Sequence, residues 1–449
     1  MRTLRSVSLI TILAAACDGG GASDPDDASI DAPLPDAASI DAPLPDAPLP
    51  DAPLPDAPPP IDAPMPIDAD IDAGPWIDPL DHTFGTDGVV TMPDGIPSQV
   101  AIDALGRIVI VGARLGPTPD MLGAGYVERR LATGAIDATF DGDGAAETPV
   151  YPTSLAVLAD GRVVVGGGQV YGAATALAYV LDATGARVGV VPGGGNQAIV
   201  AIAAMPDGGF VAAVEQGVML AQLVTVRRYR ADLSTAWTSG QVAVVTSAGA
   251  VTLAAITAGG TDRVLVTAEG ALVSLAAATG ASDGAYAVPG GSWASPFSGV
   301  PLRQVGAQVA MIDRTTDAAR VRTISVAGAY GTPVLAPSCL ALESYYGSSG
   351  AVDGAARLVV APSGGQQDQT IAVVRLASTL DQLDPAWGCG RWFTLPPLCP
   401  SGEPCLGTGT DDFAIAAAVA IAPSNAPVVV GYQRRFHGAR RGFVAKLVP

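Results

Sequence analysis

The sequence predicts an all-β fold built from about seven repeated units, and three observations lead to this prediction. A motif of Leu or Ile, then Asp, then an aromatic residue three positions after the Asp occurs at 80–90 and returns at 136–144 and 383–390, with an altered copy at 233–237. The second residues of these copies (81, 137, 234 and 384) are separated by one, two and three intervals of about 50 residues, which is typical of repeat architectures. Short runs rich in Val and Ala alternate with Gly-containing turns, as β-strands do. Aromatic residues make up only 5% of the chain, so Val, Ala, Leu and Ile must build the core.

Size and charge narrow the class of protein further. The chain has 449 residues, of which 49% are hydrophobic, and can therefore bury a large core. The formal net charge of -19 belongs mainly to the N-terminal part, because sixteen of the 43 acidic residues lie between Asp18 and Asp81. Residues 82–449 carry 22 basic and 27 acidic groups, a net charge of -5. Because there is no strongly basic domain, we predict no nucleic-acid partner.

Residues 1–16 have the order of a secretory signal. Arg2 and Arg5 precede the short apolar run 7–16, which ends in small residues just before Cys17 and is too short to span a bilayer. Small residues directly before a Cys resemble a bacterial lipoprotein signal, so we predict lipid attachment at Cys17 and an exported, membrane-anchored protein, periplasmic or at the cell surface. Two or more acyl chains would make this anchor stable. The alternative is a plain signal peptide with Cys17 discarded, and Asp18 leaves the choice between inner and outer membrane open.

Residues 17–79 predict a disordered tether rich in Asp and Pro. The unit Asp-Ala-Pro-Leu-Pro begins at Asp31, Asp41, Asp46 and Asp51. Frequent Pro excludes helix and blocks sheet pairing, so we expect an extended, polyproline-II-like spacer with an upper reach of roughly 170 Å. A spacer without a binding role is the simplest interpretation. A Pro-motif ligand and a calcium-binding acidic run are the alternatives, although these Asp residues are too dispersed for one metal cage.

Residues 80–449 divide into the repeated units, each of which we interpret as a small antiparallel sheet of up to four strands. One such small sheet cannot bury both its faces alone, so the units must stack on one another. Units of about 40 to 50 residues that stack radially form a β-propeller of four-stranded blades, and a linear β-solenoid with capped ends is the alternative. The runs that predict strands are 98–102, 107–112, 126–131, 154–157, 162–166, 178–181, 199–202, 210–214, 224–229, 251–257, 263–267, 309–312, 321–326, 357–360, 371–376, 415–421, 428–431 and 443–447.

The position of the motif within the unit predicts how the ring closes. In the clearest units, a third strand ending in Arg-Leu or Lys-Leu comes before the motif, and an outer strand follows it. The last such ending is at 446–447, two residues before the chain stops, and an unassigned outer strand stands near the other end, at 88–92. We expect 88–92 to pair beside 443–448, because a closed ring leaves few exposed strand edges.

The string LDHTFGTDGVV at 80–90 resembles the delta-sixty repeat, which has Leu-Asp, an aromatic residue, Gly and then Gly-Val-Val. The copies at 80 and 136 match well, the copy at 383 matches in part, and the copy at 233 is marginal. The resemblance implies propeller-like blades in an exported bacterial protein, and it brings no common catalytic residues. We expect the motif Asp to cap a turn. We expect the aromatic side chains to fill the gaps between blades: Phe84, Phe140, Trp237 and Trp387.

No catalytic or metal-binding pattern stands out, so we predict no enzyme and no cofactor. The two histidines, His82 and His437, are isolated, and no paired-Cys spacing suggests zinc. The glycine runs at 166–168 and 193–195 follow strands and precede no helix, so we interpret them as turns. Asp141-Gly142-Asp143 is only a fragment of a calcium loop, and a tight turn is the simpler interpretation. Three aspartates could be glycosidase carboxylates but recur in equivalent turns beside Gly, which favours turn formation: Asp103, Asp160 and Asp207.

One dense basic stretch lies between the last two predicted strands. A solvated hairpin loop is the default interpretation, and contact with an anionic cell-surface polymer or partner is the sharper hypothesis. The arginines that would make this contact are Arg434, Arg435, Arg440 and Arg441.

Four cysteines remain after Cys17, and an even number in an exported chain implies disulfides with three alternative pairings. Cys399 and Cys405 flank a short loop that could close on itself. We therefore predict the pairs Cys399–Cys405 and Cys339–Cys389, and a thiol metal site is the alternative that export disfavours.

Together these features predict a monomeric lipoprotein of the cell envelope whose propeller is a non-catalytic binding or scaffolding module. Its partners would be the membrane, through the lipid, and an envelope protein or polysaccharide. The alternative is a polysaccharide hydrolase or lyase, which needs clustered acids or a His-Tyr-Arg set at one end of the ring. A purely structural surface-display module is a third hypothesis.

Overall fold

The computed structural model describes most of the chain from Asp78 onward. The predicted signal, the lipid site Cys17 and the tether up to residue 77 lie outside the described residues, as do the other four cysteines. The described residues are 78–116, 122–168, 176–193, 197–218, 221–245, 251–258, 260–268, 271–284, 286, 302–314, 319–325, 328–329, 334–335, 345–364, 370–387, 390–395, 413–434 and 440–449.

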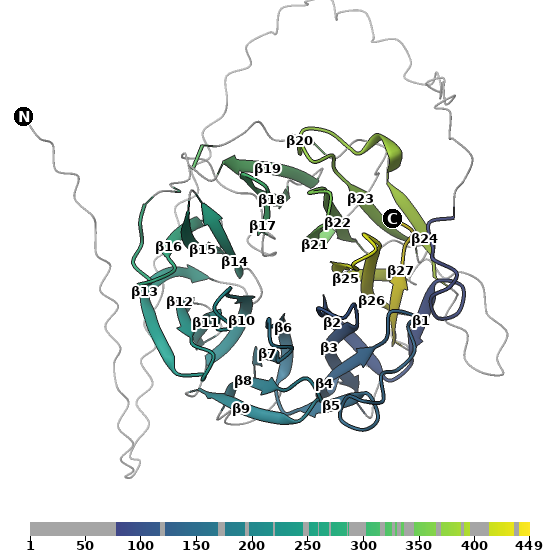
Figure 1. Ribbon diagram of the computed structural model, residues 1–449, viewed down its shortest axis with the longest axis horizontal. Helices are drawn as coiled ribbons and strands as arrows, with labels where there is room; N and C mark the ends of the chain where they lie inside the picture. Colours follow the sequence, from purple (N-terminus) through teal and green to yellow (C-terminus); the bar gives the residue numbers. More distant parts are fainter. Residues whose placement is uncertain are drawn as a thin grey trace, which may run out of the picture. The chain divides into compact units, whose positions relative to one another are not determined.

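Seven small antiparallel sheets form a ring, which confirms the predicted all-β propeller (Figure 1). Six sheets have four strands, and three strands of blade 4 are described. The first strand of each blade lies nearest the centre of the ring, and the later strands lie further out (Figure 1). The only helical element in the described residues is one 3-10 turn, η1 (Pro385–Trp387).

The strands follow one another from the inside of each blade to the outside. Blade 1 has β2 (Gly95–Ile102), β3 (Ile108–Leu115), β4 (Leu122–Arg130) and β5 (Ala145–Thr148). Blade 2 has β6 (Tyr151–Val157), β7 (Val163–Gly168), β8 (Ala176–Leu181) and β9 (Arg187–Pro192). Blade 3 has β10 (Gln197–Ala204), β11 (Phe210–Val218), β12 (Ala221–Tyr229) and β13 (Thr235–Val245). Blade 4 has β14 (Val251–Ala258), β15 (Thr261–Ala268) and β16 (Ala271–Ala276).

The remaining blades repeat this order. Blade 5 has β17 (Leu302–Val305), β18 (Gln308–Arg314), β19 (Ala319–Ser325) and β20 (Val334–Leu335). Blade 6 has β21 (Tyr345–Val352), β22 (Leu358–Gly364), β23 (Thr370–Arg375) and β24 (Arg391–Thr394). Blade 7 has β25 (Phe413–Ile421), β26 (Pro427–Arg434) and β27 (Arg440–Lys446), and its fourth strand is β1 (Val89–Met92) from the other end of the chain.

The ring closes as predicted. β1 pairs with β27 in antiparallel register, with Val89 opposite Ala445 and Met92 opposite Gly442. The closure continues beyond the strands, because the backbone N–H of Asp81 donates to the carbonyl of Lys446 at 2.8 Å. The Lys446 Nζ also lies 2.9 Å from the Asp81 carboxylate. Residues from the start and the end of the described chain therefore complete one blade.

Alternation along the second strands divides each blade into two apolar faces. In β3, Ile108 and Ile110 pack toward blade 7, whereas Val109 and Val111 pack toward blade 2. Successive side chains of a strand point to opposite faces of its sheet, so a continuous Val/Ile run serves two neighbours at once. The core therefore lies in layers between adjacent blades.

The motif aromatics fill these layers, as predicted. Phe84 is 0% exposed and joins the layer between blades 7 and 1, and Phe140, also 0% exposed, joins the layer between blades 1 and 2. Trp387 packs between blades 6 and 7, and Trp237 packs between blades 3 and 4. Three of these rings lie against a glycine of positive φ in the next blade. A Cβ added at Gly134 would come within 3 Å of the Phe84 ring, and one added at Gly280 would come within 3 Å of the Trp237 ring. A Cβ at Gly185 would lie 3.1 Å from the Phe140 ring.

The motif aspartates cap turns, as predicted, and also hold buried ion pairs. The Asp137 carboxylate accepts hydrogen bonds from the backbone N–H and the hydroxyl of Thr139, and lies 2.7 Å from Arg129 Nε. The Arg129 guanidinium stacks 4.7 Å from the Phe140 ring centroid. Asp384, Arg375 and Trp387 repeat the arrangement in blade 6, with 2.7 Å between Arg375 Nε and the carboxylate.

The match of residues 233–237 to the repeat motif is wrong. Leu233 has a φ of 67° and closes the β12–β13 turn through a bond to the carbonyl of Arg230, the place that Gly134 holds in blade 1. It does not correspond to Leu80. Trp237 then lies within strand β13, and its ring reaches the next blade from there. The cause is that β13 begins directly after the turn, so blade 3 has no capped loop before its outer strand.

A copy that sequence comparison missed lies in blade 4. Asp283 binds the carbonyl of Ser274 through its N–H, as Asp137 binds that of Arg129, and its carboxylate lies 2.8 Å from Arg263 Nε. Tyr286, three residues later, is 2% exposed and packs between blades 4 and 5. The signal was present in the string Ala-Thr-Gly-Ala-x-Asp, shared by 132–137 and 278–283.

Candidate functional site

The propeller has two ends with different connections. Because consecutive strands are antiparallel, the turns that join first to second strands and third to fourth strands gather at one end, here called the turn end. The remaining connections, including those from blade to blade, gather at the opposite end, here called the loop end. A ligand of a propeller binds where loops from several blades converge, so each end was a candidate.

The carboxylates of the turn end serve the turns themselves. The Asp103 carboxylate accepts bonds from the backbone N–H groups of Leu105 and Arg107 and from Arg107 Nε at 2.6 Å. Asp160 makes the equivalent turn in blade 2, and Asp207 pairs with Arg228 at 2.6 Å. Burial raises the pKa of Asp207, but the bonds from Arg228 and from the Gly209 N–H, together with the Arg228 charge, outweigh it and the pKa lies below its usual value. These contacts confirm the interpretation of the three aspartates as turn formers.

The loop end brings together tyrosines and arginines from three blades. On β26 and β27, Tyr432, Arg434 and Arg440 share the sheet face of Val430 and Val444, which packs toward blade 1. On blade 1, Arg114 lies on the face of Ile108 and Ile110, which packs toward blade 7, and Tyr126 packs in the same layer. We call the set facing this layer, with Tyr151 from blade 2, the Tyr–Arg cluster: Arg114, Tyr126, Tyr151, Tyr432, Arg434 and Arg440.

Close contacts hold the cluster in place. The Arg114 guanidinium lies 4.6 Å from the centroid of the Tyr126 ring, which is fully buried. A Cβ at Gly95 would lie 2.9 Å from the Tyr126 hydroxyl, and a Cβ at Gly442 would lie 2.3 Å from the Gly95 carbonyl. Blades 7 and 1 can therefore approach this closely only because both positions are glycine.

The electrostatics of the cluster link its members. Burial raises the pKa of Tyr126, Tyr151 and Tyr432 above the usual value, so all three phenols stay neutral at physiological pH. The positive charge of Arg440 opposes this rise at both Tyr151 and Tyr432, which places one guanidinium near two phenols of different blades. Tyr151 and Tyr432 are half-buried, as are Arg114, Arg434 and Arg440.

Of the four arginines predicted from the sequence, the three that the structure describes do not share one face of the sheet. Arg434 and Arg440 belong to the Tyr–Arg cluster, whereas Arg441 projects from the opposite face of the sheet. There its Nη2 donates to Gln433 Oε1 at 2.8 Å. The alternation of side chains along β27 is the reason for this division. Arg435 and His437 lie outside the described residues.

The innermost strands contribute little charge to the centre of the ring. Across β2, β6, β10, β14, β17, β21 and β25, as the structure describes them, no Asp, Glu or His occurs, and Arg303 is the one charged residue. Ser98 and Thr153 lie at bulges of these strands and donate to carbonyls of the next blade, at 2.8 Å to Pro152 and 2.9 Å to Ile199. The polar side chains here join neighbouring blades.

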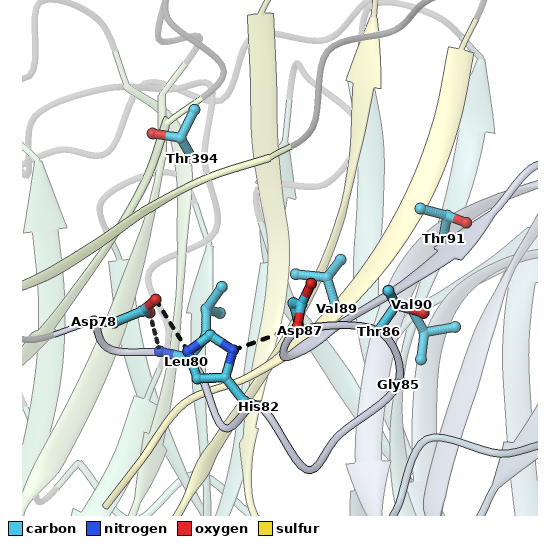
Figure 2. A pocket seen from close by; sticks show the side chains of 10 residues that line it. All are labelled: Asp78, Leu80, His82, Gly85, Thr86, Asp87, Val89, Val90, Thr91 and Thr394. Carbon is cyan, nitrogen blue, oxygen red and sulfur yellow. Dashed lines mark hydrogen bonds and ion pairs between the residues drawn. The ribbon is translucent and has the colours of Figure 1, made fainter.

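A cavity of about 530 Å³ lies at the closure of the ring, between the loop before β1 and the end of β24 (Figure 2). The His82 ring stands between two carboxylates, with Nε2 3.1 Å from Asp78 and Nδ1 3.8 Å from Asp87 (Figure 2). Valine side chains and the hydroxyls of Thr91 and Thr394 complete the lining. The His82 side chain and both carboxylates are at least half exposed.

The described residues hold no group of three or more His, Cys, Asp and Glu side chains placed to bind a metal ion. Asp141 and Asp143 belong to no such group. The Asp143 carboxylate accepts a hydrogen bond from the backbone N–H of Ala145 at 2.9 Å, which is a contact within the turn. Within the same residues, no helix has the length and apolar character that crossing a membrane requires.

Comparison with known proteins gives a likeness of fold. No protein-family model matches the chain, and no curated protein matches it in sequence. Among solved structures, the WD40 domain of Neurospora crassa Pan2 is 11% identical with a TM-score of 0.48, covering 83% of this chain and 98% of that one. The Dos1 propeller is 10% identical with a TM-score of 0.42, covering 82% and 94%. The dihydro-heme d1 dehydrogenase NirN is 11% identical with a TM-score of 0.40, covering 79% and 74%.

Proposed function

We propose that this protein is an exported binding or scaffolding module of the cell envelope, held at the membrane by lipid on Cys17 and extended from it by the Asp/Pro-rich tether. The observation that carries the binding role is the Tyr–Arg cluster. Side chains up to 326 residues apart in the sequence, from Arg114 to Arg440, meet in one layer at the loop end of the ring. Tyrosine and arginine are the side chains that dominate binding surfaces, because each combines a large apolar body with hydrogen-bonding groups.

Along the innermost strands, as far as the structure describes them, there is no Asp, Glu or His, and this is why we propose binding in place of hydrolysis by paired carboxylates at the centre of the ring. Hydrolysis of glycosidic bonds normally requires two carboxyl groups on either side of the scissile bond. At the turn end, the carboxylates of Asp103, Asp137 and Asp384 are already engaged by backbone N–H groups and arginines. A binding role asks only for a rigid surface, and the closed ring supplies one.

The test is binding of the purified full mature chain, in detergent, to isolated cell envelopes. We expect saturable binding that weakens when Tyr432→Ala or Arg440→Gln removes part of the cluster. The control is Arg187→Gln, because Arg187 also lies over a tyrosine, 5.8 Å from the Tyr179 ring, but sits at the turn end of blade 2. No binding by the wild-type chain, or equal loss in the control, would contradict the proposal.

The anchor has a separate test. Replacing Cys17 by Ser should move the protein from the membrane fraction to the soluble fraction and remove the mass of the acyl chains. Retention in the membrane without lipid would show that the anchor is of another kind.

A further inference from the structure

We infer that the Tyr–Arg cluster binds an acidic polysaccharide, whose carboxylates pair with Arg114 and whose sugar rings lie on Tyr151 and Tyr432. This inference rests on the proposed binding function and specifies its ligand. It follows from the chemistry of the cluster and from the position of the cluster in the ring.

Arg114 is prepared to bind a carboxylate. Its guanidinium is stacked on Tyr126, whose ring is fully buried and cannot move aside. Stacking on a ring face restricts the planar group without using its N–H edge, and such an edge matches the two oxygens of a carboxylate. Because little side-chain freedom remains to be lost, binding there costs less entropy than at a mobile surface arginine.

Tyr151 and Tyr432 supply the second requirement of a saccharide site. Both are half-buried, and both phenols stay neutral because burial raises their pKa. A neutral phenol offers a hydroxyl that donates and accepts hydrogen bonds with sugar hydroxyls, and a ring face that packs against sugar C–H groups. The two tyrosines come from blades 2 and 7, so residues of both blades would face the same ligand.

The charges around the cluster favour an anionic occupant. The positive charge on which this argument depends is that of Arg114, and Arg434 and Arg440, which also make other contacts, add to the basic character of the cluster. The described carboxylates on the neighbouring elements are Asp94, at the β1–β2 turn, and Glu147, opposite Tyr126 on β5. Glu128 is buried against Arg130 at 2.6 Å and is neutralised there. In the sequence, Asp411 and Asp412 precede β25, and they lie outside the described residues.

The cluster favours a saccharide over a phosphate-rich surface. Arginine forks bind phosphate as well as carboxylate, so the arginines alone do not separate the two. The tyrosines do, because their ring faces have no role in binding phosphate and a direct one in packing against sugar rings. The test therefore varies the two side-chain types separately.

The experiment measures binding of the full mature chain, in detergent, to polygalacturonate, with neutral dextran and vesicles of anionic phospholipid as comparison probes. We expect polygalacturonate binding that weakens as salt rises, no dextran binding, and about tenfold weaker binding for Arg114→Gln and for Tyr432→Ala, as for loss of one charge-assisted bond or stacking contact. Arg441→Gln and Arg187→Gln should bind as wild type, since both remove a charge elsewhere. Thermal unfolding of each variant checks that the ring is intact, and Tyr432→Phe keeps the packing if Tyr432→Ala does not fold.

The outcomes separate the two levels of the proposal. Unchanged polygalacturonate binding in both cluster variants, equal binding of dextran, or binding of the phospholipid vesicles alone would overturn the saccharide assignment. If the wild-type chain still bound cell envelopes in those cases, the binding function would stand without this ligand. Release of unsaturated or shortened uronate chains would support the ligand class and overturn the non-catalytic role.

Discussion

Replacing Phe84 by Ala should loosen the ring specifically where it closes. The Phe84 ring is 0% exposed and packs between Ile110 of blade 1 and Val430 of blade 7. Deleting a fully buried phenyl ring costs about 3 to 5 kcal/mol when its surroundings cannot collapse. Here they cannot collapse freely, because the backbone of Gly134 already lies against the ring, where even a Cβ would come within 2.9 Å.

The effect should be local, because Phe84 stabilises the only blade that is built from both ends of the described chain. Opening the β1–β27 pair breaks no covalent connection between blades. A loss of about 3 kcal/mol at this seam should therefore raise the opening equilibrium there by roughly 100-fold or more. Hydrogen exchange measures this directly at the amides of Val89–Met92 and of their partners Gly442–Ala445.

The matched control is Phe140→Ala, which removes an equally buried ring from the same motif between blades 1 and 2. Those blades are joined by the chain, so we expect faster exchange around blades 1 and 2 and unchanged protection of β1 and β27. If both variants increased exchange at β1 and β27 equally, the noncovalent seam would not be the weakest point of the ring. A cost below about 1 kcal/mol for Phe84→Ala would refute the packing argument itself.

Three further predictions concern stability and covalent structure. Gly431→Ala should lower the free energy of unfolding by about 1 to 3 kcal/mol, because the new Cβ would lie 2.0 Å from the Ile415 carbonyl at a bulge of the inner strand. In the control, Gly142→Ala, the new Cβ meets no atom within 4 Å, so the substitution should cost only backbone strain. Equal costs in thermal unfolding of the two variants would contradict this prediction. Burial raises the pKa of Asp137, but the bonds from Thr139 and Arg129 together outweigh this effect, and the pKa lies below its usual value. The Asp137 carboxylate therefore stabilises the fold above about pH 4, and this contribution is lost as the pH falls through the pKa of the folded state. Asp137→Asn should therefore cost about 3 kcal/mol at pH 7 and less in acid, and a gap between the denaturation curves that does not change with pH would show that the charge is unimportant. Mass mapping of a non-reduced digest should find two disulfides, and free thiols or other pairs would rule out Cys399–Cys405 and Cys339–Cys389.

Much of the fold could be predicted from local patterns. Val-rich runs such as 163–165 are buried on both faces, and only a strand between two apolar layers explains such a run. The closing strand could be predicted because the repeat has a phase: the last unit lacks an outer strand, and the first motif supplies one at Val89–Met92. The motif aromatics were identified for the same reason, since one position recurs beside the same turn in several blades.

Where the local pattern varies, sequence comparison failed. The Asp283 copy was missed because its Leu or Ile is Ser282 and its aromatic residue is Tyr286, so the apolar part of the signal is weak. Trp237 was placed in the correct layer but through the wrong register, because a strand and a capped loop can both deliver an indole to the same gap. Packing between blades requires a bulky ring at that place and tolerates several backbone routes to it.

The Tyr–Arg cluster could not have been found along the chain. Arg114, Tyr151 and Arg440 have no shared motif and no regular spacing, and the two arginines lie near opposite ends of the described chain. Periodicity reports which face of a strand an individual side chain occupies, and this is why strands, turns and the closing segment followed from residue patterns alone. Which faces meet depends on how the seven sheets pack and on glycines that let two of them approach closely. These are contacts between residues far apart in the sequence, and no local pattern records them.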